Sequence, residues 1–197
     1  CSQRGIYVHF IRHNEKIYPY FKWIDNLRFN GYNHKNPEKC MIDLMDVKNL
    51  DSEKMYKIYD VWPKIAEESF NFKHKKIEIE NIKHIVFAGM GGSGAIGDVF
   101  SSILSKTNIH VTIVKGYVLP KTVTKETLVV TTSVSGDTVE SLTILEEAVK
   151  KKCKIIAFSS GGKMENFCKK KHLEHRKFKQ NHSPRASFTV FLYGMLN

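Results

Sequence analysis

The chain has 197 residues, of which 42% are hydrophobic, so it can bury one substantial core, and a single domain is the default expectation. No apolar run approaches the roughly 18 to 20 residues that a membrane-spanning helix needs, and no N-terminal stretch resembles a secretory signal. The four cysteines show neither CxxC spacing nor histidines at zinc-ligand distance, which argues against a metal site or a disulfide framework. We therefore expect a cytoplasmic protein with reduced thiols and no membrane partner.

The net charge of +11 is concentrated in one segment, because residues 150–185 contain twelve Lys or Arg and two acids. Such a segment can bind the phosphates of nucleic acid or of another polyanion. It lacks the regular interleaving of aromatic and basic residues that favours single-strand binding. We expect solvated helix ends and loops that draw anionic ligands toward the protein, and no nucleic-acid partner.

Residues 1–40 hold eight aromatic residues by Tyr32 but show no sustained helical or strand period, and the first residue is Cys1 rather than Met. They are expected to form an irregular extension. An equally open alternative is that Met41 is the natural start and that the residues before it come from upstream translation. In that case the extension is not native.

Residues 41–83 are expected to be a helical lead-in and a linker. Asp51 or Ser52 can cap the first free amides of a helix, and apolar residues then follow at helical spacing. Pro63 cannot continue the hydrogen-bond ladder, which predicts a break or kink before a second helical piece. The predicted pieces are a helix to Trp62, a helix over Lys64–Phe70 and a polar linker over 71–83.

From His84 onward the predicted strands and helices alternate. Strands are expected over residues 84–88, 109–114, 127–132 and 154–159. Helices are expected over residues 92–105, 138–152, 163–170 and 184–196. Alternation with short connections predicts a three-layer α/β fold, in which helices cover both faces of a doubly wound parallel sheet. Ligands of such sheets bind beyond the carboxyl ends of the strands, where the strand order reverses.

Residues 84–98, HIVFAGMGGSGAIGD, pass from a predicted buried strand through a glycine turn directly into a helix. This geometry presents backbone N–H groups and the positive end of a helix dipole to an anion. Glycine is favoured there because a side chain would keep a phosphate away from the backbone. The turn predicts a phosphorylated ligand.

Gly89, Gly91 and Gly94 match the G-x-G-x-x-G dinucleotide fingerprint, with the required strand before and helix after. The fingerprint also expects an acidic residue about twenty positions further on, to bind the adenosine ribose. The sequence there contains Lys115 and no acid. Lys115 can instead meet a 2′-phosphate, so an NADP-dependent oxidoreductase remains as a weaker alternative.

A second loop, Ser133-Val-Ser-Gly-Asp-Thr138, follows the third predicted strand and leads into a helix. Its three hydroxyls and one glycine at a helix N-terminus suit the three oxygens of a phosphate monoester. The plainer interpretation is an ordinary helix cap, but a cap needs one such residue and the loop has three. A third loop, residues 159–163, repeats the pattern after the next strand.

The GMGGSG turn, the S-x-S-G-x-T loop and the later Pro184-Arg185-Ala186 together resemble the first sugar isomerase (SIS) domain of archaeal-type bifunctional phosphoglucose/phosphomannose isomerases. The resemblance runs from about Met41 to the C-terminus and implies a flavodoxin-like strand order. The sequence departs from the family where Val134 replaces the usual Tyr and Asp137 the usual Asn. The stretch before Pro184 lacks the expected glycine.

The resemblance implies a role for each loop. Ser133, Ser135 and Thr138 would bind the phosphate of the sugar, and Gly91, Gly92 and Ser93 would face the sugar itself. Arg185 would stabilise the negative charge of an enediolate, for which a permanently charged planar donor is well suited. Without the motif, Arg185 is read as a surface ion-pair residue at a helix start. No metal or nucleotide cofactor is implied.

Aldose–ketose isomerisation also needs a carboxylate base and a second acid–base group. In the family these are a glutamate and a histidine on a second SIS domain, beyond Asn197. The local alternatives are weak: Glu140 is expected on the solvent face of its helix, and His172, His175 and His182 have no specific spacing. We therefore expect a truncated, incomplete catalytic unit.

Two classes of function stay open. The first is one domain of an isomerase that converts glucose 6-phosphate or mannose 6-phosphate into fructose 6-phosphate. The second is a sensor that binds sugar phosphates without turnover. A homodimer is expected, because the apolar pattern at the C-terminus would leave an exposed face.

Overall fold

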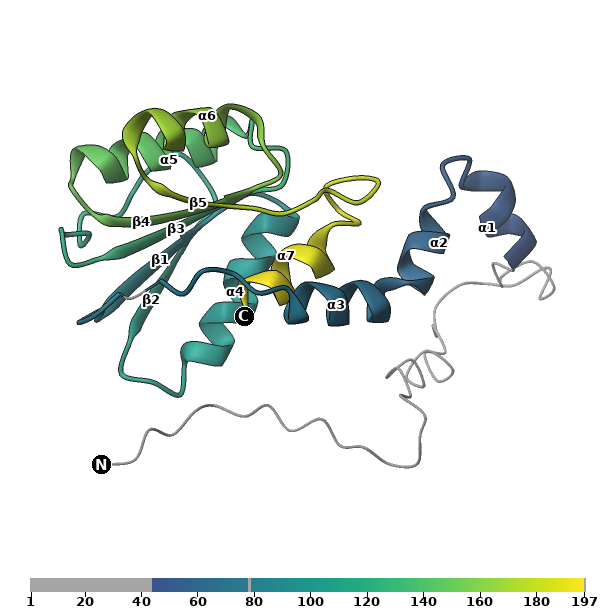
Figure 1. Ribbon diagram of the computed structural model, residues 1–197, viewed down its shortest axis with the longest axis horizontal. Coiled ribbons are helices and arrows are strands. Elements are labelled where there is room, and N and C mark those ends of the chain that lie inside the picture. Colours follow the sequence, from purple (N-terminus) through teal and green to yellow (C-terminus); the bar gives the residue numbers. More distant parts are fainter. Residues whose placement is uncertain (1–43, 78, 197) are drawn as a thin grey trace, which may run out of the picture. The chain divides into compact units, whose positions relative to one another are not determined.

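The computed structural model describes residues 44–77 and 79–196, which belong to one compact unit, Leu44–Asn197 (Figure 1). The predictions of an irregular extension over residues 1–40 and of a start at Met41 lie outside the described residues. Among those that are described, no helix combines the length and the apolar character needed to cross a bilayer.

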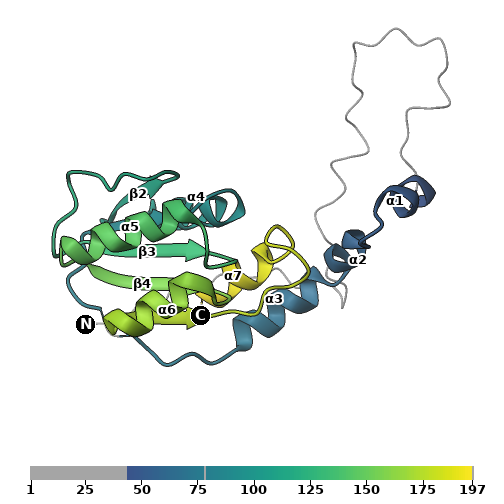
Figure 2. The ribbon, with the colours of Figure 1, turned by 90° about the horizontal axis from the view of Figure 1, so that it is seen from above.

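Five parallel strands form one sheet in the order β2-β1-β3-β4-β5 (Figures 1 and 2). The predicted doubly wound parallel sheet of flavodoxin-like order is therefore confirmed. The strands are β1 (His84–Ala88), β2 (His110–Val114), β3 (Leu128–Ser133), β4 (Lys154–Ser159) and β5 (Glu174–Lys177). The first four lie within one residue of their predicted positions.

The sequence does not predict β5. Its four residues, EHRK, are polar, and its side chains are exposed or half-buried, so it has no apolar run to mark it. Among the described strands it pairs with β4 alone, at the edge of the sheet, where charged side chains are common because one side of the strand faces solvent.

Helices cover both faces of the sheet, as predicted (Figure 1). One face carries α4 (Gly92–Leu104) and α7 (Phe188–Met195), and the other carries α5 (Val139–Lys150) and α6 (Gly162–Lys171). Alternate strand residues face opposite layers. The ladder partners Val86 and Val129 pack with Ile144 of α5. The next partners, Phe87 and Val130, belong to the cluster on the α4 face.

Three short helices precede the sheet: α1 (Leu44–Leu50), α2 (Met55–Asp60) and α3 (Trp62–Asn71). The sequence does not predict α1. The Asp51 carboxylate accepts a hydrogen bond from the Tyr56 N–H at 2.8 Å and so stabilises the start of α2. The break expected near Pro63 falls at Val61, and Pro63 lies in the first turn of α3, where its missing N–H is not needed.

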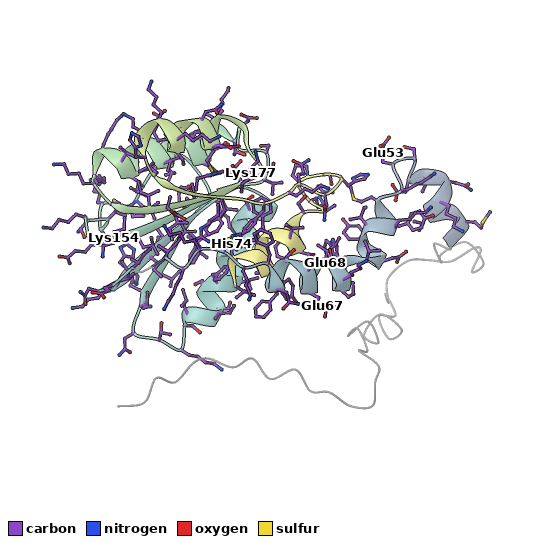
Figure 3. All side chains as sticks on the ribbon, in the orientation of Figure 1. Glu53, Glu67, Glu68, His74, Lys154 and Lys177 are labelled. Carbon is purple, nitrogen blue, oxygen red and sulfur yellow. The ribbon has the colours of Figure 1, made fainter. Side chains whose placement is uncertain are left out.

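The segment predicted as a linker packs onto the sheet. Ile77, Ile79 and Ile82 contact the apolar cluster on the α4 face. Lys154, at the start of β4 (Figure 3), donates a hydrogen bond to the Glu80 carbonyl at 2.7 Å. These contacts order the backbone that leads into β1.

The last helix begins at Phe188 rather than at Pro184, because residues 181–187 form a turn that is hydrogen-bonded internally. The Asn181 N–H donates to the Ser187 hydroxyl at 2.8 Å, and Trp62 Nε1 donates to the Ala186 carbonyl at 3.0 Å. The apolar face of α7 is covered within the chain, contrary to expectation, since Phe191 is fully buried beside α4.

Thr131 of β3 offers a stability test, because its side chain is fully buried and its hydroxyl makes no hydrogen bond within the described residues. We expect Thr131→Val to raise the free energy of unfolding by about 1 kcal/mol, since it removes an unsatisfied polar group without changing shape. Urea denaturation measures this. The matched control is Thr127→Val, because the Thr127 hydroxyl bonds to His84 Nδ1 at 3.2 Å and accepts from the Thr124 N–H at 3.0 Å.

We expect Thr127→Val to lower stability by about 1 to 2 kcal/mol through the lost hydrogen bonds. Equal losses in both variants would show that Thr131 has a partner.

Three partly buried histidines predict a pH dependence of stability. Burial lowers the pKa of His74 (Figure 3), His84 and His175 below the ordinary value of about 6.5. The unfolded chain therefore binds more protons than the folded chain just below that pH. We expect the free energy of unfolding to be highest above pH 6.5 and to fall as the pH drops through the folded-state pKa values. Denaturation at pH 5 to 8 tests this, and a flat profile would contradict it.

Candidate functional site

Three loops meet at the carboxyl ends of β1, β3 and β4, and we call them the carboxyl rim: residues 89–94, 133–138 and 159–163. The first loop lies directly against the end of β3, since a Cβ on Gly89 would lie 2.9 Å from the Thr132 carbonyl oxygen. This is the point between β1 and β3 at which the strand order reverses, where ligands of doubly wound sheets bind.

The glycine turn leads into α4 as predicted. Gly91 has φ 54°, a conformation that favours glycine, and both Gly91 and Gly92 are exposed. A Cβ built at either position meets no atom within 4 Å, so the space beside the turn is open. Ser93 is half-buried. The N-cap residue of α4 is Gly91, which has no side chain to cap the helix.

The second loop, residues 133–138, which we call the hydroxyl loop, is held by one of its own serines. Ser133 is buried, and its Oγ lies 2.8 Å from Thr138 Oγ1 and accepts a hydrogen bond from the Gly136 N–H at 3.0 Å. Ser135 is exposed, and its Oγ accepts from the Asp137 N–H at 3.2 Å. The sequence assigns the three hydroxyls one role, whereas the structure separates a buried one from the more accessible Ser135 and Thr138.

The plainer interpretation of this loop as a helix cap does not describe the structure. Thr138 is the N-cap residue of α5, but its side chain makes no capping hydrogen bond and turns to Ser133 instead. The first amides of a helix need an acceptor from outside the helix. They and the helix dipole therefore remain available to an anion that enters beside Ser135.

The third loop supports the second through a glycine-to-glycine contact that the sequence does not reveal. Gly136, with φ 79°, lies so close to the third loop that a Cβ would stand 1.9 Å from the Gly161 carbonyl oxygen. A Cβ on Gly162, with φ 69°, would stand 2.6 Å from the Ser135 carbonyl oxygen. The only signal in the sequence is the presence of glycine in both loops.

Arg185 is exposed on the turn before α7. Within the described residues it makes neither the surface ion pair expected in the absence of a motif nor a hydrogen bond to the carboxyl rim. The structure thus places the glycine turn beside the end of β3, where the second loop starts, and does not connect Arg185 to either loop.

Three of the four candidate acid–base groups, His175, His182 and Glu140, have partners. His175 Nε2 lies 2.8 Å from the buried Ser159 hydroxyl, and His182 Nε2 lies 2.9 Å from the Glu53 carbonyl oxygen. Glu140 is half-buried rather than on the solvent face, and its hydrogen bond with Tyr117 raises the pKa of that tyrosine.

Lys115, the residue that the sequence offers to a 2′-phosphate, forms an ion pair with Asp98 of α4 at 2.6 Å. Its side chain packs over Gly94, whose Cβ position lies 3.2 Å from Lys115 Cε. Among the described residues, no group of three or more His, Cys, Asp or Glu is arranged to hold a metal ion.

The strand order and the loops at its switch point define a doubly wound α/β domain with a candidate binding site at the carboxyl rim. The chain belongs to the SIS domain family, whose model matches residues 78–194. The family suggested by the GMGGSG turn, the S-x-S-G-x-T loop and Pro184-Arg185-Ala186 is therefore confirmed.

Curated relatives include a bifunctional phosphoglucose/phosphomannose isomerase from Caldicellulosiruptor bescii, which is 32% identical over 136 residues that cover 68% of this chain and 38% of the relative. The enzyme of the same name from Aquifex aeolicus is 34% identical over 139 residues, which cover 68% of this chain and 43% of the relative. The chain thus spans about two fifths of the length of these relatives.

Among solved structures, an Escherichia coli CFT073 protein, determined as a complex, has a TM-score of 0.55 and 21% identity, over 79% of this chain and 89% of that one. The Vibrio vulnificus NanR protein complexed with ManNAc-6P has a TM-score of 0.52 and 16% identity, over 71% of this chain and 59% of that one. At these identities the likeness concerns the fold.

Proposed function

We propose that the chain is the phosphosugar-binding SIS domain of an aldose–ketose isomerase that interconverts glucose 6-phosphate or mannose 6-phosphate with fructose 6-phosphate, a reaction of glycolysis and gluconeogenesis. The observation that carries the proposal is the start of α5. The side chain of its N-cap residue makes no capping hydrogen bond, and the hydroxyls of Ser135 and Thr138 belong to the loop that leads into this helix. The family and the names of the curated relatives support it.

The phosphate is proposed to bind at the hydroxyl loop. Its oxygens would accept hydrogen bonds from Ser135, Thr138 and the first amides of α5, which suits a dianion better than a neutral ligand. Ser133 belongs to the same site, and since its hydroxyl already bonds within the loop, its main contribution is to hold Thr138 in place.

The sugar is proposed to lie against Gly91, Gly92 and Ser93, beside which the space is open. Arg185 would stabilise the enediolate as a permanently charged donor. The glutamate base and the histidine are proposed to lie on a second SIS domain. The curated relatives have room for one, since each is more than twice as long as the region that matches this chain. No metal or nucleotide cofactor is needed for this chemistry, because the proton moves between neighbouring carbons of the sugar.

We also propose that the protein is a cytoplasmic homodimer. Met45, Leu50 and Val61 are exposed apolar side chains of the helical lead-in, which would favour self-association. Light scattering of the purified chain tests the dimer.

A sensor that binds sugar phosphates without turnover is the second candidate. Two acids lie near the proposed phosphate, and both are hydrogen-bonded. Asp137 of the hydroxyl loop accepts from the Lys163 amide, and Glu140 in the first turn of α5 bonds with Tyr117. Among the described residues, the carboxyl rim therefore has hydroxyls and amides that would suit a phosphate, and neither of these two carboxylates is free to act as a base.

Calorimetric titration with fructose 6-phosphate, paired with a coupled isomerase assay, separates the two candidates. Binding with turnover supports the isomerase, and binding without turnover supports the sensor. The absence of binding would contradict both.

The NADP-dependent oxidoreductase is the weakest candidate, because Lys115 is already paired with Asp98. It would require NADPH binding that Lys115→Glu weakens, and fluorescence titration with NADPH measures this directly.

A further inference from the structure

We propose that Asp137 is a positioning residue, which fixes the hydroxyl loop by capping α6 and thereby directs its own negative charge away from the bound phosphate. This inference rests on the proposed function, since it concerns the same phosphate site. It assigns a role to the one charged side chain of the loop.

The side chain of Asp137 extends from the hydroxyl loop to the start of α6. Its Oδ1 accepts a hydrogen bond from the Lys163 N–H at 3.0 Å, and Lys163 is the second residue of α6. The N-cap residue of α6 is Gly161, which has no side chain that can accept from these amides. Asp137 therefore provides from another loop the acceptor that a capping side chain usually provides.

This bond is the last of a series that joins the second and third loops. The Ser160 N–H donates to the Val134 carbonyl at 2.9 Å, and the Met164 N–H donates to the Gly136 carbonyl at 2.9 Å. Asp137 extends the series to the residue next to Thr138. Because the Gly136–Gly161 contact leaves no room between the loops, the position of α6 determines where the hydroxyls of the second loop lie.

The negative charge of Asp137 explains why its side chain should point toward α6. A carboxylate between Ser135 and Thr138 would repel a phosphate dianion if it faced the same side as their hydroxyls. Its interaction with α6 places it instead at the positive end of a ten-residue helix, where a negative charge is stabilised. The same contact thus orders the loop and separates the like charges.

The test compares three substitutions of Asp137 and one control substitution by calorimetric titration with fructose 6-phosphate, at a temperature where circular dichroism shows each variant folded. Asp137→Ala removes the acceptor, and we expect affinity about tenfold weaker than that of the wild type. Asp137→Asn keeps an acceptor oxygen at the same position, and we expect affinity within about threefold of the wild type. Glu146→Ala, which removes an exposed acid from α5, is the matched control and should bind like the wild type.

Asp137→Glu keeps the charge but displaces the carboxylate by one methylene, and we expect it to bind as weakly as Asp137→Ala. If Asp137→Ala does not fold, the comparison of the Glu and Asn variants decides the question. Wild-type affinity in Asp137→Glu, or an Asn variant as weak as the Glu variant, would overturn the proposed role. If the wild-type chain itself fails to bind, the proposed function fails first and this inference with it.

Discussion

Gly136→Ala is expected to lose about 3 to 5 kcal/mol of unfolding free energy and most of its affinity for a sugar phosphate. The new Cβ would stand 1.9 Å from the Gly161 carbonyl oxygen, where no side-chain rotation can relieve the overlap because both atoms are tied to backbone. The residue also has φ 79°, which disfavours any side chain. The two loops must therefore move apart.

That movement would break the hydrogen bonds between the loops. The bonds at risk are those from the Met164 N–H to the Gly136 carbonyl and from the Lys163 N–H to Asp137. Urea denaturation measures the loss of stability, and calorimetry measures the loss of affinity. Gly116→Ala is the matched control, because a Cβ at Gly116 meets nothing within 4 Å, and it should behave like the wild type. A Gly136→Ala variant as stable as this control would contradict the contact.

The apolar pattern of the sequence predicts the centre of the sheet, and it does so because β1, β3 and β4 are buried on both faces. Each of them contains an apolar run and is followed by a loop rich in glycine or serine, so its carboxyl end is marked in the sequence. The same rule misses β5, whose polar residues are held at the edge by pairing with β4 alone. It also misses α1, since a seven-residue helix contains too few turns for a clear period.

The sequence predicts which loops form the candidate site but not how they support one another. Ser133 and Ser159 pair across β3 and β4, and this register places the two following loops side by side. The Gly136–Gly161 contact and the bond from Lys163 to Asp137 depend on that register, which no local pattern encodes. From the sequence alone, Gly136 and Gly161 look like ordinary turn residues, and their contact with each other is missed.

The accessible hydroxyls give the second prediction with a large effect. Ser135→Ala and Thr138→Val are each expected to weaken binding of fructose 6-phosphate by about 1 to 3 kcal/mol, which is about 5- to 150-fold. The physical reason is the loss of a hydrogen bond to a charged acceptor. Calorimetric titration measures it. Ser102→Ala is the matched control, since the Ser102 hydroxyl donates to the Asp98 carbonyl within its own helix.

The two variants should differ in stability. Ser135 is exposed, so its truncation should change the free energy of unfolding by less than about 0.5 kcal/mol, as for other surface substitutions. Thr138→Val also deprives the buried Ser133 hydroxyl of a partner at 2.8 Å, which should cost about 1 kcal/mol. Affinity lost in Ser135→Ala without loss of stability would therefore reflect contact with the phosphate. Unchanged affinity in both variants would refute the proposed placement of the phosphate at these two hydroxyls.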